Sequence, residues 1–189
     1  IQKELVDEDC EKSELKPQSP YAETKLKSEE FISRMASKGK IEASIIRLGT
    51  IFGTSKGMRF HTAINKFCWQ AVLGQPLTIW RTALDQKRPY LGLNDAVNCI
   101  DFFLNKELFD GGIYNVVTSN YTVNQVIDFI KYFIDDLQID LVDNKIMNQL
   151  SYEVSTDKIE SLGFVFKDNL GDGIEQTISL LSNSNLASE

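Results

Sequence analysis

Apolar side chains recur along the chain with two different periods, and these periods divide it into helices and strands. Over 60–73 and again over 122–137, the apolar positions fall on one face of a helix. Short apolar runs bounded by polar residues or glycine predict strands at 42–48, 76–80, 88–93 and 113–117. Helices that alternate with buried strands in this way are typical of a parallel α/β sheet.

Local signals mark where several of these helices begin and end. Ser19 can accept a hydrogen bond from the first unpaired N–H groups, and Pro20 at the first helical position leaves no N–H unsatisfied. This pair predicts a helix that starts near Ser19 and ends at 36–37. Thr122 with Gln125 forms a capping box and opens the second amphipathic helix.

The remaining segments are assigned from weaker signals. Asn94 or Asp95 is expected to cap a further helix, and C-terminal helices are expected near 155–162 and 174–181. Segments without a clear period are expected to form loops or a frayed tail: 1–18, 49–57 and 182–189. The loop that starts at Gly49 follows the carboxyl end of a strand, where open α/β sheets bind their ligands.

Tyr21 and Lys25 are the first residues that suggest chemistry. They lie one turn apart at the start of the first helix and therefore share a face. An ammonium beside a phenol favours the phenolate, which makes the Tyr a candidate general base. Taken alone, Tyr-x-x-x-Lys also fits an ordinary helix surface, so the pair indicates a site only together with other motifs.

Those other motifs follow in order along the chain. The strand after the Tyr helix ends in Arg47-Leu48-Gly49-Thr50-Ile51-Phe52-Gly53, and Lys87-Arg88-Pro89-Tyr90-Leu91-Gly92-Leu93-Asn94-Asp95 comes later. Their order and spacing resemble the C-terminal half of the extended short-chain dehydrogenase/reductase family, specifically its NAD-dependent nucleotide-sugar epimerases and dehydratases. The resemblance implies part of a Rossmann-type, doubly wound parallel sheet over 1–57. It implies a smaller α/β substrate-binding lobe over 58–189, with some elements returning to the sheet.

The resemblance also implies a mechanism. Tyr21 would remove a proton from a sugar hydroxyl while the same carbon gives up hydride to NAD, with NADP as the alternative cofactor. Lys25 would favour the Tyr phenolate and bind the cofactor ribose, and Gly49 would contact the nicotinamide. Whether the product is that of an epimerase, a dehydratase or a reductase stays open.

Substrate contacts are implied at six positions: Thr50, Thr78, Trp80, Arg88, Lys145 and Tyr152. Arg88 corresponds to an arginine that grips the nucleotide phosphates, and Trp80 lies beside the base unless it is an ordinary half-buried Trp. Lys145 stands where the family commonly has Arg, so a solvated lysine is the alternative there. The family's Asn-Leu pair near the nucleotide falls on 63–64 here, which leaves three candidate replacements: Arg59, His61 or Asn65.

Composition narrows the remaining possibilities. A net charge of −7 argues against nucleic acid as a partner, and no apolar run is long enough to cross a membrane. Cys10, Cys68 and Cys99 are far apart and lack metal-ligand spacing. We therefore expect no metal site, reduced thiols in a cytoplasmic protein, and Cys68 and Cys99 as packing groups on helices.

The glycine-rich turn that binds a dinucleotide pyrophosphate does not occur in this sequence. The resemblance places that turn before the Tyr helix, so the chain is expected to lack the N-terminal half of the enzyme and to be inactive alone. Strand 42–48 is then expected to need that half or a partner chain, and the full-length protein is expected to form a homodimer. The alternative is a non-catalytic module that binds a nucleotide sugar or a protein partner.

Overall fold

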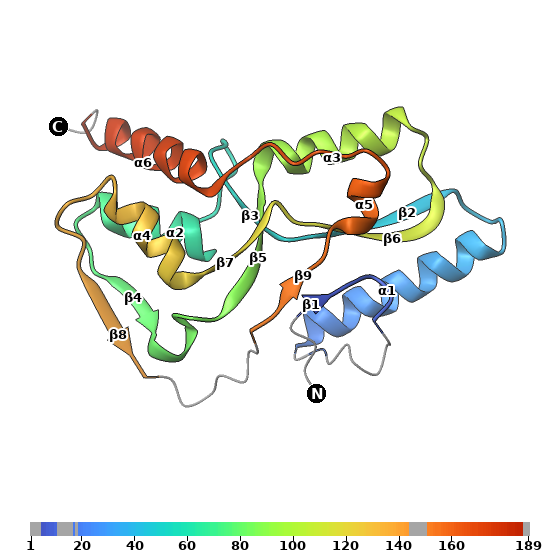
Figure 1. The fold of residues 1–189 in the computed structure, drawn as a ribbon, viewed down its shortest axis with the longest axis horizontal. Coiled ribbons are helices and arrows are strands. Elements are labelled where there is room, and N and C mark those ends of the chain that lie inside the picture. The colour runs from blue at the N-terminus through green and yellow to red at the C-terminus, as the bar shows by residue number, and fades with distance from the viewer. Residues whose placement is uncertain (1–4, 11–16, 18, 144–150, 187–189) are drawn as a thin grey trace.

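The computed structural model of the chain describes residues 5–10, 17, 19–143 and 151–186. Figure 1 shows two groups of elements side by side, joined by a central sheet. The first group has these bounds: α1 Pro20–Ser37, β2 Ala43–Leu48, α3 Leu93–Asn105, β6 Asp110–Val116 and α5 Asp157–Ser161. The second group has these: α2 Ala63–Val72, β4 Leu77–Trp80, α4 Val123–Lys131, β8 Ile139–Val142 and α6 Leu170–Leu186.

The central sheet consists of β3 Thr50–Phe52, β5 Lys87–Gly92 and β7 Ser119–Thr122. Strand β5 lies in the middle, parallel to β3 and antiparallel to β7. The other strand pairs are all parallel: β2 with β6, β4 with β8, and β1 Leu5–Val6 with β9 Glu153–Val154. The expected α/β class with parallel strands is confirmed.

Two hydrophobic cores correspond to the two groups of elements. In the first group, α1 and α3 lie on opposite sides of the β2–β6 pair (Figure 1), and α3 packs Phe103 edge-on against Tyr114 of β6 at 5.0 Å. In the second group, α2, α4 and α6 enclose a core that also takes in Phe52 of β3. The proposed domain boundary at residue 57 remains a prediction.

The local signals for helix starts act as expected. Ser19 accepts a hydrogen bond from the Ala22 amide at 3.2 Å, with Pro20 at the first helical position. Thr122 and Gln125 form the expected capping box at the start of α4. Both signals are short-range, so the sequence alone contains what is needed to recognise them.

Several expected boundaries are wrong. Segment 1–18 contains strand β1, and segment 49–57 contains β3, because each pairs with a strand distant in sequence. Helix α4 ends at Lys131 and turns before 137. Residues 182–186, expected in a frayed tail, continue α6. There Ser184 donates to the carbonyl of Leu180 one turn earlier.

The cap of α3 also differs from expectation. The helix starts at Leu93 with Gly92 as the capping residue, so Asn94 and Asp95 lie inside its first turn. The capping acceptor comes from outside: the Asp168 carboxylate accepts from the Asp95 amide at 3.0 Å. A side chain at Gly92 would meet Asp168 at 2.1 Å, which explains the glycine.

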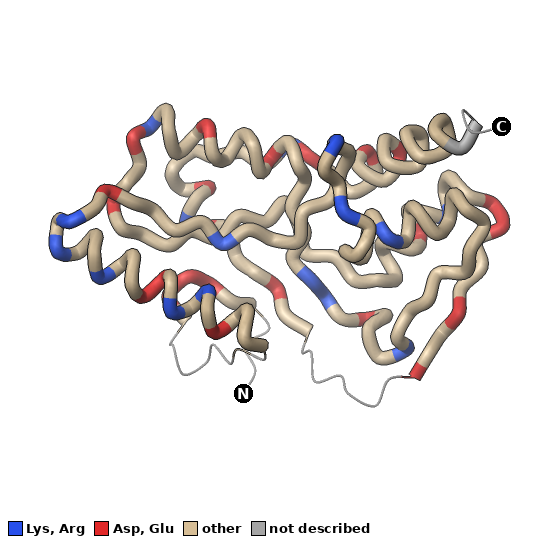
Figure 2. The backbone as a smooth tube through the Cα atoms, turned by 180° about the vertical axis from the view of Figure 1, so that it is seen from behind, with Lys and Arg blue, Asp and Glu red and all other residues tan. Residues whose placement is uncertain are grey.

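The structure adds two observations on charge and hydropathy. Figure 2 shows basic and acidic residues intermixed along α1 and over both groups of elements. In the part of the chain that the structure describes, no helix has the length and apolar character needed to cross a membrane.

Candidate active site

Tyr21 and Lys25 share one face of α1, as their spacing predicts. The Lys25 ammonium nitrogen lies 5.6 Å from the centre of the Tyr21 ring. The Tyr21 side chain is 72% exposed, so its hydroxyl is accessible from solvent. The structure therefore pairs a phenol with an ammonium on an open surface, where both can reach a ligand.

Helix α1 is fixed to the sheet by an ion pair that the sequence analysis did not identify. Glu29 on α1 accepts from Arg47 on β2 through both carboxylate oxygens, at 2.6 Å from Nη2 and 3.0 Å from Nε. Both side chains are mostly buried. The hydrogen bond to Glu29, opposed by desolvation, raises the pKa of Arg47. This pair connects the Tyr21–Lys25 helix to the strand that ends beside Gly49.

Gly49 lies where the chain passes from β2 to β3. Its amide donates to the Val116 carbonyl at 2.9 Å. A Cβ atom here would approach the backbone of Pro89 and Tyr90 to 3.2–3.3 Å, so the close approach of β5 favours glycine. The next residue, Thr50, is exposed and pairs with Tyr90 in the strand register. The predicted cofactor-contacting glycine and the first predicted substrate residue therefore border β5.

Arg88, on the same strand β5, contacts another predicted substrate residue. Its guanidinium lies 5.5 Å from the centre of the Tyr152 ring, an arrangement that favours a cation–π interaction. Its Nη2 donates to Gln86 Oε1 at 2.8 Å. Arg88 and Tyr152 are far apart in sequence, and the fold brings them together.

Strand β4 presents the third group of predicted residues. Thr78 and Trp80 alternate with buried neighbours and are both exposed on one face of the strand, Trp80 by 41%. In the parallel register they lie opposite Asp140 and Val142 of β8. Lys145, the remaining predicted substrate residue, lies outside the described residues.

Asn65, one of three alternatives for a nucleotide contact, has a structural role. The side chain is 4% exposed on α2 and donates to the Arg59 carbonyl at 3.2 Å. Its Oδ1 accepts from the Gly53 amide. Asn65 thus holds the loop between β3 and α2 in place, which leaves Arg59 and His61 as the exposed alternatives.

The sequence analysis missed two side-chain contacts that hold strand backbones in place. Glu8 Oε1 accepts from the amide of Asn115 on β6 at 2.7 Å. Asn120 on β7 bonds both backbone polar groups of Val154. Asparagine is depleted in strands, so Asn115 within the predicted strand 113–117 was a usable signal, whereas the strand that carries Asn120 was not predicted. Glu8 and Val154 carry no comparable signal, because their contacts are long-range.

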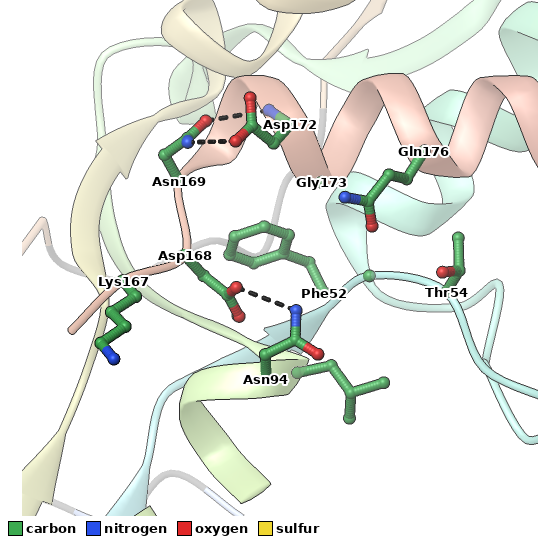
Figure 3. A pocket seen from close by; sticks show the side chains of 12 residues that line it. Phe52, Thr54, Asn94, Lys167, Asp168, Asn169, Asp172, Gly173 and Gln176 are labelled. Atoms are coloured by element: carbon green, nitrogen blue, oxygen red, sulfur yellow. Dashed lines mark hydrogen bonds between the residues drawn. The ribbon is translucent and has the colours of Figure 1, made fainter. Parts of the chain in front are cut away.

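A polar pocket lies between the end of β3 and the starts of α3 and α6, and none of the predicted site residues that the structure describes lines it (Figure 3). Its side chains are largely satisfied by each other: Asn94 donates to Asp168 at 3.0 Å, and Asn169 exchanges two hydrogen bonds with Asp172. Buried Asp95 behind it accepts from the amides of 167 and 168. These contacts cap two helices and join the two groups of elements.

The donor set agrees with part of what a nicotinamide dinucleotide needs. The exposed phenol and ammonium of α1 can bond ribose hydroxyls. The sequence holds no glycine-rich turn for the pyrophosphate. Among the described residues there is no cluster of His, Cys, Asp and Glu that could hold a metal.

The chain resembles known proteins over nearly its whole length. The model of the NAD dependent epimerase/dehydratase family matches residues 2–116. A trifunctional UDP-glucose 4,6-dehydratase/3,5-epimerase/reductase from Arabidopsis thaliana is 27% identical over 172 residues, covering 89% of this chain and 25% of the relative. A dTDP-D-glucose 4,6-dehydratase from Bos taurus is 28% identical over 178 residues, covering 89% of this chain and 49% of the relative.

Solved structures show the same fold. A UDP-glucuronic acid 4-epimerase from Bacillus cereus, in complex with NAD, superposes with a TM-score of 0.80 at 20% identity, covering 97% of this chain and 56% of that one. A UDP-glucose 4-epimerase from Thermus thermophilus, also in complex with NAD, superposes with a TM-score of 0.76 at 20% identity, covering 88% of this chain and 55% of that one. The chain thus spans a quarter to just under a half of the two curated relatives, and just over half of these two structures.

Proposed function

The chain belongs to the NAD-dependent epimerase/dehydratase family, and from this premise we propose that it supplies the catalytic and nucleotide-sugar-binding residues of an NAD(P)-dependent nucleotide-sugar epimerase or dehydratase. The dinucleotide pyrophosphate would be bound by residues that are not in this sequence, in an N-terminal half or a partner chain. Alone, the chain is then inactive in hydride transfer.

Tyr21 is the proposed base. Its exposed hydroxyl takes the proton of a sugar hydroxyl, and the neighbouring Lys25 ammonium stabilises the negative charge that this leaves on the phenol oxygen. NAD, when bound, supplies the reversible hydride acceptor for that carbon. Lys25 also bonds the ribose hydroxyls, and Gly49 contacts the nicotinamide.

The substrate lies across β5 in this proposal. Arg88, held against the Tyr152 ring, binds the diphosphate, and Thr50 bonds the sugar. Thr78 and Trp80 on β4 contact the nucleotide base, for which Trp80 offers an exposed aromatic face. Lys145 is proposed as a further phosphate contact.

The observation that carries this proposal is the unit formed by α1 and β2. The Tyr21–Lys25 contact lies on a capped helix, and the Glu29–Arg47 pair fixes that helix to the strand that ends at Gly49. A base, its charge partner and the proposed nicotinamide contact are therefore held on one scaffold.

Tyr21→Phe tests the proposed base in a protein that also contains a dinucleotide-binding half. We expect hydride transfer, followed by NADH absorbance in single turnovers, to fall by at least ~10²–10⁴-fold, the contribution typical of a general base. Binding of UDP-glucose should persist, because the lost hydroxyl is not among the groups proposed to bind the diphosphate or the base. Tyr132→Phe is the matched control, since that Tyr is 85% exposed on the other group of elements. Normal turnover by Tyr21→Phe would exclude the proposed role.

One observation favours the alternative of a non-catalytic binding module. Within the described part of the chain, β2 pairs only with β6, which leaves its other edge without a strand partner, and Leu48 at its end is 46% exposed. Such an edge can accept a strand from another protein. For the enzyme, we propose that an N-terminal half or a partner chain occupies this edge, and that α1, with Phe31 53% exposed, contributes to a homodimer.

A further inference from the structure

The segment that carries Tyr152 is held on several sides by other parts of the chain. Ser151 Oγ accepts from the Lys87 amide at 3.0 Å, and Glu153 forms an ion pair with the Lys87 side chain. On its other side, β9 pairs in parallel with β1. The direct backbone bond of Tyr152, to the Lys87 carbonyl, is long at 3.5 Å and therefore weak.

Asn120 supplies the most complete of these contacts. Its Nδ2 donates to the Val154 carbonyl at 3.1 Å, and its Oδ1 accepts from the Val154 amide at 3.0 Å. A single side-chain amide thus replaces the peptide group of a neighbouring strand, at a part-buried position where an unpaired backbone group is costly. By contrast, the side chains of the Lys87–Glu153 ion pair are 44% and 36% exposed, respectively, so this pair contributes little to holding the segment in place.

The position of Asn120 connects this contact to the proposed diphosphate site. In the strand register Asn120 lies opposite Pro89, the residue next to Arg88. Val154 comes two residues after Tyr152, whose ring faces the Arg88 guanidinium at 5.5 Å. Asn120 therefore fixes the β9 backbone relative to the strand that presents Arg88.

From these contacts we propose that Asn120 is a positioning residue, which holds the Tyr152 ring against Arg88 so that the guanidinium is oriented before a nucleoside diphosphate binds. This inference rests on the proposed nucleotide-sugar function. Asn120 touches neither ligand nor reacting atoms. It acts through the backbone of β9, and its contribution to binding depends on the Tyr152 ring.

Titration calorimetry of the 189-residue chain with UDP tests the proposal. We expect Asn120→Ala to weaken UDP binding about tenfold, because two hydrogen bonds that preorganise the site are lost. Arg88→Ala should weaken it more. Asn94→Ala is the matched control: this amide also makes a side-chain hydrogen bond, to Asp168, but in the polar pocket of Figure 3. It should leave UDP affinity unchanged.

A double-mutant cycle separates positioning from a general loss of structure. In a Tyr152→Ala background, Asn120→Ala should cost no further UDP affinity, because the ring that it positions is gone. If Asn120→Ala unfolds, as judged by circular dichroism, Asn120→Asp takes its place. That carboxylate keeps the acceptor for the Val154 amide but faces the Val154 carbonyl without a donor, and a loss of three- to tenfold is expected.

The outcomes separate this inference from the proposed function. No binding of UDP by the parent chain, or no effect of Arg88→Ala, would overturn the proposed function and this inference with it. A loss in Arg88→Ala without a loss in the Asn120 variants would overturn the inference alone. An equal loss for Asn120→Ala with and without the Tyr152 ring would also overturn it. A loss of UDP affinity for Asn120→Ala that occurs only when the Tyr152 ring is present would support the inference.

Discussion

Replacing Glu29 by Gln should loosen the helix that carries Tyr21 and Lys25. Helix α1 has no fully buried residue, so its attachment depends on partly buried contacts with β2 and β6 and on the pair that Glu29 forms with Arg47. Glu29→Gln preserves size and one acceptor oxygen but removes the charge. Arg47, whose side chain is only 22% exposed, is then left without a full counter-charge.

The expected cost follows from the geometry of the pair. A hydrogen bond to a charged group contributes about 1.5–3 kcal/mol net, and removing one partner of a fully buried ion pair costs ~3–5 kcal/mol. Here the side chains retain 18% and 22% exposure, so solvent recovers part of the loss. We expect Glu29→Gln to lower the free energy of unfolding by about 2 kcal/mol.

Urea denaturation at neutral pH measures this change, and hydrogen exchange locates it. Amides of α1 should exchange faster in Glu29→Gln, while those of α3 on the opposite side of the β2–β6 pair should not change. Asp128→Asn is the matched control, because its pair with Lys131 is exposed and 3.7 Å long. Asp128→Asn should lower the free energy of unfolding by less than about 0.5 kcal/mol.

A double variant, Glu29→Met with Arg47→Met, checks the cause. Replacing both charges by apolar groups of similar length removes the unpaired buried charge, so stability should recover relative to Glu29→Gln. Equal stability losses for Glu29→Gln and Asp128→Asn, or unchanged exchange along α1, would refute the reasoning that this pair holds the helix.

Two further predictions concern titration and thiol chemistry. Desolvation of the Asp110 carboxyl is outweighed by hydrogen bonds from Tyr114, the Gly112 amide and other donors, which lower its pKa. That stabilisation is present above the unfolded-state pKa of Asp110 and is lost as the pH falls through its folded-state pKa. Asp110→Asn should therefore be less stable than the parent at pH 7. In unfolding measurements near pH 2, the two proteins should be equally stable. Burial raises the pKa of the Cys68 thiol to about 12 and of Cys99 to about 11, so both should resist a thiol reagent until the chain unfolds. Fast native-state labelling of either would contradict this.

The features that the sequence predicted correctly are local. Ser19 with Pro20 and Thr122 with Gln125 define helix starts within one turn of chain, and the Tyr21–Lys25 contact follows from helical spacing alone. The apolar periods located the main helices because a single stripe of each faces a core. Arg88 and Tyr152 were assigned to one site by family resemblance, and the structure brings them into contact.

The features that were missed depend on long-range pairing. Thr50–Phe52 is too short to show a strand period, and it becomes β3 only because β5 lies beside it. Strands β1 and β9 are two-residue strands that pair with each other although most of the chain separates them in sequence. The α6 extension was hidden by its Ser/Asn-rich composition, although hydroxyls such as Ser184 can bond back to helical carbonyls.

The contacts of Asp95 and Asp168 affect how the molecule can flex. Asp168 accepts from the amide of Asp95, and Asp95 in turn accepts from the amide of Asp168. These reciprocal bonds join the start of α3 in one group of elements to the segment that enters α6 in the other. If the two groups of elements move relative to each other when a substrate binds, we expect the Asp95–Asp168 contact to act as the hinge. The largest displacements should then occur in the parts of each group that lie farthest from this contact.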